Sequence, residues 1–383
     1  MPLPLFCPNP ECPNHRSPPR RWYARYGSYH TLAHGEVQRF RCVACRRTCS
    51  EQTESLHYYA KRRVPFREVQ LSLAGGSPMR EIARRYRFTP AVIERAVIRL
   101  GRQSMAAHAR MLTKLNPRTR VCADGLRSFV TSKDYPCDIT TVVDPAGEVI
   151  LSSVHSTFVR GGTMTASQQQ RLSAKLAVWR PKPGTMSEDI SLVFNEMWEY
   201  LRPEIPKPLR LDTDCNPLYV GALERDPVAN HWKAGDLLEH HQTPSTDPRT
   251  NLNPLASVNY VDRLLRHRVR EHFRRTFAFG RNASAQMHRF WIFAFDLNCR
   301  REWRVKVPEL GVHAAKDAVA VEAIERVNSG FYVRRVRLND VPVPETLRRA
   351  WMHEIPTPPH RWKKGQKEPT VRVPKFAIRD LAS

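Results

Sequence analysis

Three aspartates in this sequence lie on apolar stretches that are typical of buried strands or helices. Asp124 belongs to a stretch that begins at Val121, and Asp214 closes another that begins at Leu209. Asp262 lies within a pattern of helical spacing. Carboxylates are preferred ligands of hard divalent cations, and paired cations catalyse displacement at phosphodiesters. The three acids therefore predict a site that binds hard divalent cations and acts on a phosphodiester.

The choice of the second acid has an alternative. Asp212 and Asp214 are two residues apart on the same expected strand, so their side chains share one face. We prefer Asp214 because it closes the strand just before the break at Asn216-Pro217, and Asp212 then supports it. Asp124 taken alone is equally consistent with a turn or surface position. His241 and Arg249 are expected either to support the site near the scissile phosphate or to be ordinary loop residues.

The pattern around Asp262 predicts a helix over residues 255–273. At 100° per residue, Asp262 falls on the apolar side of this helix and Glu271 on the opposite side. A carboxylate on a core-facing side is costly unless it is paired or bound to a metal ion. Asp262 is therefore the better third ligand, and a salt bridge to Arg266 is the alternative. The basic flank is expected to follow DNA phosphates or to be solvated; it comprises Arg263, Arg266 and Arg270.

The overall charge of the chain indicates a polyanionic partner. Among 383 residues, 62 Lys and Arg oppose 37 Asp and Glu, which gives a net charge of +25 spread along the chain. Nucleic acid is the partner that this charge favours, and a basic ribosome-associated or membrane-surface protein is the alternative. No apolar run of about 18 residues and no signal segment occurs, so we expect no membrane association. We therefore expect a cytosolic protein.

The N-terminal cysteines predict a zinc ribbon over residues 1–55. Of the nine cysteines, five lie in the first fifty residues, and two short-spaced pairs, Cys7/Cys12 and Cys42/Cys45, suit one tetrahedral Zn²⁺. In a reducing compartment such clustering favours metal over disulfides. His15 is an alternative ligand, and Cys49 is a spare cysteine.

Residues 60–112 are expected to form a helix-turn-helix domain. Ser77-Pro78 and Thr89-Pro90 are both helix start signals. The second helix places apolar residues inward and Arg95, Arg99 and Arg102 outward, which suits reading of a DNA major groove. An ordinary helical hairpin with solvated arginines is the alternative.

Residues 118–338 change to a pattern of strands and helices. Strands at 121–130, 139–143 and 149–154 predict an antiparallel meander, followed by a helix at 187–201 and the strand Leu209–Asp214. Residues 339–383, rich in Pro, Lys and Arg, are expected to form an extended basic arm. The fold class is therefore a multidomain α+β protein.

The sequence resembles DDE-superfamily transposases of bacterial insertion sequences, which have a zinc ribbon, a helix-turn-helix and an RNase H-like catalytic domain. The matching pieces span residues 1–300; they are CPNPECPNH, RFRCVACRRTCS, VCADGLRSF, LDTDCNPLY and the segment from HHQTPSTDPRT to FDLNC. The resemblance implies that Asp124 is the acid on the first strand, Asp214 that on the fourth strand and Asp262 that on the last helix. Gly125 departs from the family, which often has Glu there, and the third acid is Asp rather than Glu.

The resemblance implies a DNA transposase that binds terminal inverted repeats. Two Mg²⁺ (or Mn²⁺) ions held by the acids would support DNA 3′-end cleavage and strand transfer, and Zn²⁺ would be structural. The implied partners are double-stranded DNA and further copies of the chain. A non-catalytic DNA-binding regulator derived from such a transposase is the alternative of another class, and a structure-specific nuclease is a third possibility.

Overall fold

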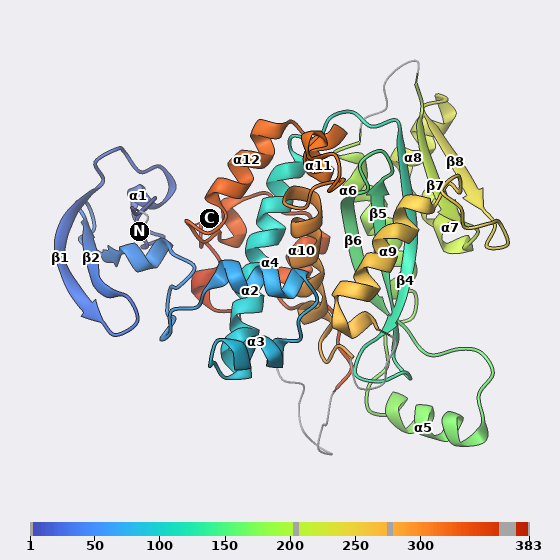
Figure 1. Cartoon of the computed structure of the whole chain (residues 1–383), viewed down its shortest axis with the longest axis horizontal. Helices are drawn as coiled ribbons and strands as arrows, with labels where there is room; N and C mark the ends of the chain where they lie inside the picture. The colour runs from blue at the N-terminus through green and yellow to red at the C-terminus, as the bar shows by residue number, and fades with distance from the viewer. Residues whose placement is uncertain (1–2, 202–206, 274–278, 360–372, 382–383) are drawn as a thin grey trace.

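The computed structural model of the chain is a mixed α+β structure with two β-sheets (Figure 1). It describes residues 3–201, 207–273, 279–359 and 373–381. Within these ranges there are thirteen α-helices and five short 3-10 helices. The α+β class predicted from the sequence is thus confirmed.

The smaller sheet lies at the N-terminal end and has the order β1-β2-β3, with both pairs antiparallel. Its elements are α1 (Pro13–Arg16), β1 (Tyr23–Thr31), β2 (Gly35–Cys42) and β3 (Thr48–Ser50). The core of this unit is small and contains Trp22 and Phe40 beside the clustered cysteines. Strand β1 has little buried surface, because five consecutive residues, 24–28, are exposed. So small a core is insufficient to stabilise a separate fold without a further constraint.

The larger sheet has five strands in the order β6-β5-β4-β7-β8. The strands are β4 (Arg120–Phe129), β5 (Pro136–Asp144), β6 (Val149–Thr157), β7 (Leu209–Asp214) and β8 (Leu238–Thr243). Strands β4, β5 and β6 form the antiparallel meander predicted from the sequence, whereas β4, β7 and β8 are parallel. Strand β4 is therefore the element at which the two types of pairing meet.

Helices cover both faces of this sheet (Figure 1). The face with Val121 and Ala123 packs against the helices that precede and follow β7, and the opposite face, with Cys122 and Leu126, packs against a later helix that contains Asp262. These helices are α6 (Thr185–Trp198), α7 (Pro217–Glu224), α8 (Pro227–Ala234), α9 (Ala256–Arg268) and α10 (Ala283–Cys299). Helix α5 (Ala166–Leu176) lies beyond one end of the sheet (Figure 1). In the part of the chain that the structure describes, no helix has both the length and the apolar character needed to cross a bilayer.

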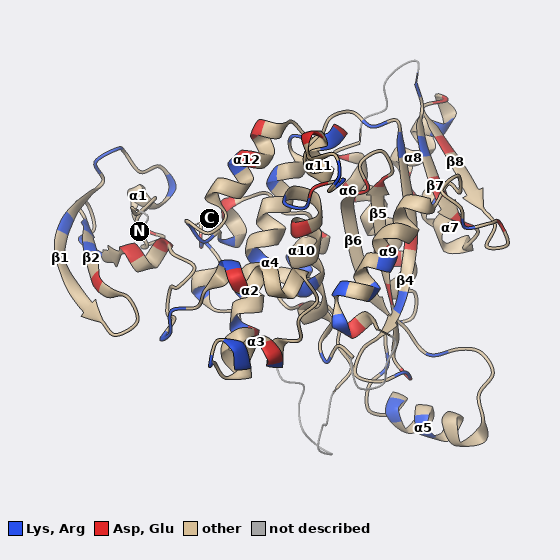
Figure 2. Cartoon of the chain, viewed as in Figure 1, with Lys and Arg blue, Asp and Glu red and all other residues tan. Residues whose placement is uncertain are grey.

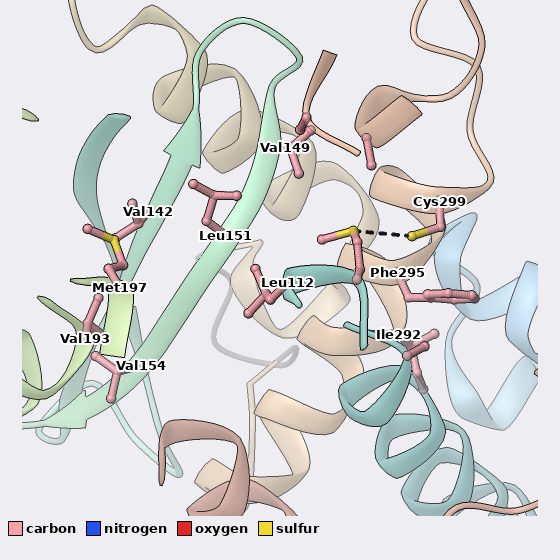
Figure 3. Close-up of a cluster of buried hydrophobic side chains, with 14 of the residues drawn as sticks. Leu112, Val142, Val149, Leu151, Val154, Val193, Met197, Ile292, Phe295 and Cys299 are labelled. Carbon is pink, nitrogen blue, oxygen red and sulfur yellow. Dashed lines mark hydrogen bonds between the residues drawn. The ribbon is translucent and has the colours of Figure 1, made fainter. Parts of the chain in front are cut away.

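The core continues from the sheet into the helical N-terminal region. Figure 3 shows Val142, Leu151 and Val154 of the sheet together with Leu112 and Phe295 from two helices. The helices of the N-terminal region are α2 (Phe66–Ala74), α3 (Met79–Arg85) and α4 (Pro90–Leu112). Because one cluster of buried residues spans both regions, the expected boundary near residue 112 does not separate two cores.

Helix α4 begins as predicted, at Thr89-Pro90, but its second half is enclosed by the protein. All residues from Leu100 to Ala109 are buried, and α4 lies against α10. The contact is close because a Cβ atom at Gly101 would lie 2.3 Å from the ring of His288. Small residues allow two helices to approach in this way, and this stretch of α4 is rich in glycine, serine and alanine.

The prediction that Arg102 points outward is wrong. Its guanidinium group is buried and donates hydrogen bonds to the carbonyl oxygen of Trp351 at 3.1 and 3.3 Å. Burial, with the nearby charge of Arg99, lowers the pKa of Arg102 to about 10. Arg99 is half-buried and donates to the carbonyl oxygen of Leu56, whereas Arg95 is exposed. Of the three arginines, only Arg95 keeps the outward position that DNA reading requires.

The C-terminal region is folded over most of its described length. Its helices are α11 (His313–Asp317), α12 (Val321–Gly330) and α13 (Glu345–Trp351). Trp351 is fully buried between α4 and α10, so the expected extended arm at 339–383 is wrong for the part that contains α13. Residues 360–372, which carry many of the expected arm's basic residues, lie outside the described residues. The high proline content suggested an extended arm, but proline also occurs at the bends of compact, well-packed segments.

We predict that one buried ion pair between the N-terminal and C-terminal regions is important for stability. Glu54 lies 2.9 Å from Arg337, and both side chains are buried. Replacing Glu54 by Gln removes the closer counter-charge of the buried Arg337 and leaves it only Asp340, at 3.7 Å. The free energy of unfolding should therefore fall by about 3 kcal/mol. Denaturant unfolding measures this change. The control Glu81→Gln, which breaks the exposed pair with Arg84, should change stability by less than about 0.5 kcal/mol.

Candidate functional site

Four cysteines form a compact cluster at the N-terminal end. The Sγ atoms of Cys7, Cys12, Cys42 and Cys45 all lie within 4.8 Å of one another. The pairs Cys7–Cys45 and Cys12–Cys42 are 3.4 and 3.8 Å apart. A tetrahedral Zn²⁺ about 2.3 Å from each thiolate would hold its sulfur ligands roughly 3.8 Å apart. The cluster therefore fits a structural zinc ion, as the sequence predicted.

The surroundings of the cluster decide between the alternative ligands. His15 is not a member of the cluster, and its Nδ1 atom lies 2.6 Å from the carbonyl oxygen of Cys7. Cys49 lies in the same small core but is not a member of the cluster. Burial raises the pKa of Cys7. Burial acts in the same direction on Cys42, but hydrogen bonds from Asn14 and from two backbone N–H groups lower its pKa to about 6.

A second group of interest is formed by the acids of the larger sheet. In the parallel pair of β4 and β7, Ala123 is opposite Thr213, so Asp124 and Asp214 are the next residues along each strand. Neighbouring strands are about 4.8 Å apart, and residues in register point to the same face. This register brings together two aspartates that are ninety positions apart in the sequence.

Asp262 approaches the same face from α9. Helix α9 packs on the side of the sheet that carries Cys122 and Leu126, and Asp262 follows Val261, which is fully buried in that contact. One carboxylate oxygen of Asp262, Oδ1, is buried with no hydrogen-bond partner among the described residues. A buried oxygen without a donor is costly, so Asp262 differs from carboxylates whose oxygens are paired within the protein.

The electrostatics indicate that these acids are close enough to affect one another. Burial and, to a lesser extent, the charges of Asp214 and Asp138 raise the pKa of Asp124 to about 6. Burial and the charge of Asp124 raise the pKa of Asp262 well above its usual range. The charge of Arg249 opposes both shifts. Arg249 is exposed, and its charge acts on both acids.

Asp138 is an acid near this group that sequence reasoning missed. It lies on β5, is buried, and forms an ion pair with Arg127 at 3.1 Å. A Cβ atom at position 125 would lie only 2.4 Å from the Asp138 carboxylate, which explains why Gly125 is accommodated there. The signal in the sequence was weak, because Asp138 opens a β-branched strand and looks like an ordinary strand boundary.

The structure also separates the two acids of β7. Asp212 is fully buried and lies 2.6 Å from Arg120, 2.8 Å from Arg210 and 3.2 Å from His241. These partners give Asp212 a structural role and leave Asp214 as the acid beside Asp124. His241 contacts Asp212, so its expected support of the metal site is indirect. The two acids share a strand face, as predicted, but only tertiary contacts show which of them is neutralised.

The helix predicted over 255–273 ends earlier, at Arg268, and a 3-10 turn follows at Arg270–His272. The expectation that Glu271 points away from the core is wrong. Glu271 is buried and its carboxylate accepts a hydrogen bond from Arg289 Nε at 2.6 Å. The change of direction after Arg268 turns the acid inward.

The arginines of α9 differ in their surroundings. Arg263 and Arg270 are exposed, as expected for a flank that follows phosphates. Arg266 is partly buried, and its Nη2 atom donates to the carbonyl oxygen of Arg127 at 3.4 Å. Arg270 follows α9 in the 3-10 turn, and its Nε atom donates to the carbonyl oxygen of Gly76 at 3.0 Å. Arg263 is therefore the predicted side chain that is accessible to a partner on this face.

The acids are less tightly clustered than the cysteines. Among the described residues, the four cysteines are the one group of three or more His, Cys, Asp or Glu whose ligand atoms all lie within 4.8 Å. The oxygens of Asp124, Asp214 and Asp262 are thus spread more widely than the coordination shell of a single small ion. Comparison with protein-family models and with curated proteins found no match to this chain.

We predict that the purified protein contains one zinc ion per chain. Replacing Cys42 by Ser should remove this zinc and loosen the small sheet, because metal binding contributes folding free energy there. Metal analysis and proteolysis of residues 1–55 measure both effects. The control Cys49→Ser should keep the zinc, and loss of zinc from this variant would contradict the ligand assignment.

A second prediction concerns the effect of pH and charge on the metal-free protein. Because the folded pKa of Asp262 is raised, its ionisation costs free energy in the folded state, and stability should fall as pH rises above the ordinary carboxyl range. At pH 8 without divalent cations, Asp262→Asn should therefore stabilise the protein, by about 1–3 kcal/mol. Asp212→Asn should do the opposite, because it breaks a buried ion-pair network. Thermal unfolding at pH 5 and pH 8 measures both variants.

Proposed function

We propose that this protein is a metal-dependent DNA transposase that cuts and joins DNA strands with Asp124, Asp214 and Asp262. One observation carries the proposal. The register of β4 and β7 sets two aspartates side by side, and α9 presents a third acid, with a buried and unpartnered oxygen, to the same face. Structural carboxylates are normally paired, as Asp212 is, so this difference supports a functional role.

The wide spacing of the acids is consistent with two ions. Two Mg²⁺ ions about 4 Å apart, each about 2.1 Å from its oxygen ligands, span roughly 8 Å between the outermost oxygens. Such a pair does not need three carboxylates within the shell of one ion. Mg²⁺ also keeps several water or phosphate ligands, so few protein oxygens are sufficient. The excess negative charge around Asp124 and Asp262 would be balanced when the ions bind.

The three aspartates and Arg249 would have different roles in the reaction. Bound Mg²⁺ would activate a water molecule or a DNA 3′-hydroxyl and stabilise the leaving oxygen. Asp124 and Asp214, fixed on neighbouring strands, would hold the ions at constant separation, and Asp262 would complete the site from α9. Arg249 is exposed and near enough to affect both Asp124 and Asp262, so it suits contact with a phosphate beside them.

The arrangement of elements also supports the resemblance to DDE-superfamily transposases. The acids lie on the first and fourth strands of the five-stranded sheet and on a helix that follows it, in the order expected for an RNase H-like domain. Lys and Arg are distributed over the small sheet and the helical body, as a DNA partner requires (Figure 2). Zinc-stabilised β1–β3 and the exposed Arg95 are further candidates for DNA contact.

A cleavage and strand-transfer assay tests the proposal. Purified protein is incubated with DNA that carries the ends flanking its gene, in Mg²⁺ or Mn²⁺. We expect 3′-end cleavage and joining, and we expect Asp124→Asn, Asp214→Asn and Asp262→Asn each to lower the rate at least about 100-fold, because each removes a cation ligand. Binding to the same DNA should persist, since these changes leave the basic surfaces intact.

The matched control is Asp236→Asn, which changes an exposed aspartate with a positive φ angle that asparagine also accepts. Its activity should equal that of the wild type. Wild-type activity in all three site variants would refute the assignment. DNA binding without any cleavage would instead favour the non-catalytic regulator, and cleavage without joining would favour a nuclease.

A further inference from the structure

The segment between β6 and α6 is purely cationic. Residues 149–187 contain five Lys and Arg residues and no Asp or Glu, although the sheet and helices on either side carry acids. Within this segment, α5 stands away from the body, beyond one end of the larger sheet (Figures 1 and 2). Leu172 is the one buried residue of α5. A helix with so little buried surface contributes little to a core, so its position calls for another explanation.

Specific contacts hold α5 in place. The hydroxyl group of Tyr135, in the turn between β4 and β5, donates to the carbonyl oxygens of Lys175 and Trp179 at 2.8 and 3.0 Å. The side chain of Thr165 caps the start of the helix. An isolated helix of eleven residues is only marginally stable in water, so these contacts both stabilise α5 and determine its orientation.

The same turn carries an acid that gathers three cations. Asp134 is buried, and its carboxylate lies 2.6 Å from Lys175, 3.4 Å from Arg160 and 3.4 Å from Arg171. One carboxylate balances one of these three charges. Arg160 comes from the end of β6, and Arg171 and Lys175 come from α5. Asp134 offsets only part of the repulsion among these three positive charges. Two positive charges are left over for a further anion.

A cavity of about 510 Å³ opens beside this group. Besides the three cations and Asp134, its lining includes Thr131, Ser132, Lys133 and Gln168. Side-chain hydroxyl, amide and guanidinium groups together are hydrogen-bond donors suited to a tetrahedral oxyanion, and guanidinium groups bind phosphate in a bidentate manner. The lining contains four cations and one acid, which excludes a cationic ligand.

We propose that this cavity binds a backbone phosphate of the DNA strand on which the enzyme acts, with Arg160, Arg171 and Lys175 as its ligands. The proposal rests on the proposed function, because it identifies DNA as the source of the phosphate. Asp124 and Phe129 are five residues apart on β4, which corresponds to about 17 Å, and Phe129 lines the cavity. The cavity therefore lies about five base steps from the acids, given a rise of roughly 3.4 Å per step.

The salt dependence of DNA binding tests this site. The double variant Arg171→Gln/Lys175→Gln removes two charges that line the cavity. The matched control, Arg180→Gln/Lys182→Gln, removes two exposed charges from the same segment that do not line it. The probe is a 30-base-pair duplex, measured by fluorescence anisotropy over a series of salt concentrations. Divalent cations are omitted, so the result does not depend on whether the protein cleaves DNA.

We expect DNA binding to become less dependent on salt only in the variant Arg171→Gln/Lys175→Gln. The slope of log affinity against log salt should fall by about 1 to 2, because each lost phosphate contact lowers it by roughly 0.9. Equal slopes in the two double variants would overturn the proposal. Circular dichroism and thermal unfolding verify that both variants are folded.

Asp134→Asn separates phosphate binding from a structural role of the ion pairs. Removal of the competing charge should strengthen DNA binding about two- to tenfold at constant salt, because the three cations are then free for phosphate. If Asp134→Asn instead weakened binding as much as the loss of Arg171 and Lys175, the group would serve only to hold α5. That outcome would also overturn the proposal.

Discussion

The parallel pairing of β4 with β7 is the constraint on which the candidate site depends. Strand β4 is antiparallel to β5 on one side and parallel to β7 on the other, so the meander and the later crossover strands meet at β4. The pairing sets Asp124 beside Asp214, and the side chains alternate so that both point towards α9. A shift of one residue in this register would turn Asp214 to the opposite face, where α6 and α7 pack.

Charge balance then distinguishes the acids of this region. Asp212 is fully buried and lies against Arg120, Arg210 and His241. Asp124 and Asp262 have no such set of partners, and burial together with the acids around them raises their pKa values. The chain has a net charge of +25, so the region around Asp124 and Asp262, where the acids are not balanced by cations, is a local exception. The opposite imbalance occurs around Asp134, where three cations surround one acid. The two sites thus have opposite charge imbalances, which is the basis of the cation proposed at one and the phosphate proposed at the other.

The N-terminal and C-terminal regions are joined to this body through buried polar contacts. Arg102 of α4 donates to the backbone of Trp351, and Arg337 pairs with Glu54 beside the small sheet. Both contacts link residues more than two hundred positions apart. Contacts of this kind make α4 a part of the enclosed core over much of its length. The DNA contacts proposed for the N-terminal region are therefore restricted to the exposed start of α4 and to the small sheet.

The sequence alone determined the local elements and the zinc ligands. The spacing of Cys7, Cys12, Cys42 and Cys45 identified the cluster, because two short loops suffice to surround one ion. The strands around Asp124 and Asp214 and the start of α4 followed from residue periodicity and from start signals. Periodicity describes one element and its immediate neighbours in sequence. It therefore did not show that Arg102 is covered by α13, that Glu271 turns inward to Arg289, or that Asp138 lies beside Gly125. Those positions were decided by the tertiary structure, because they depend on which distant segments pack together and on which charges are thereby neutralised.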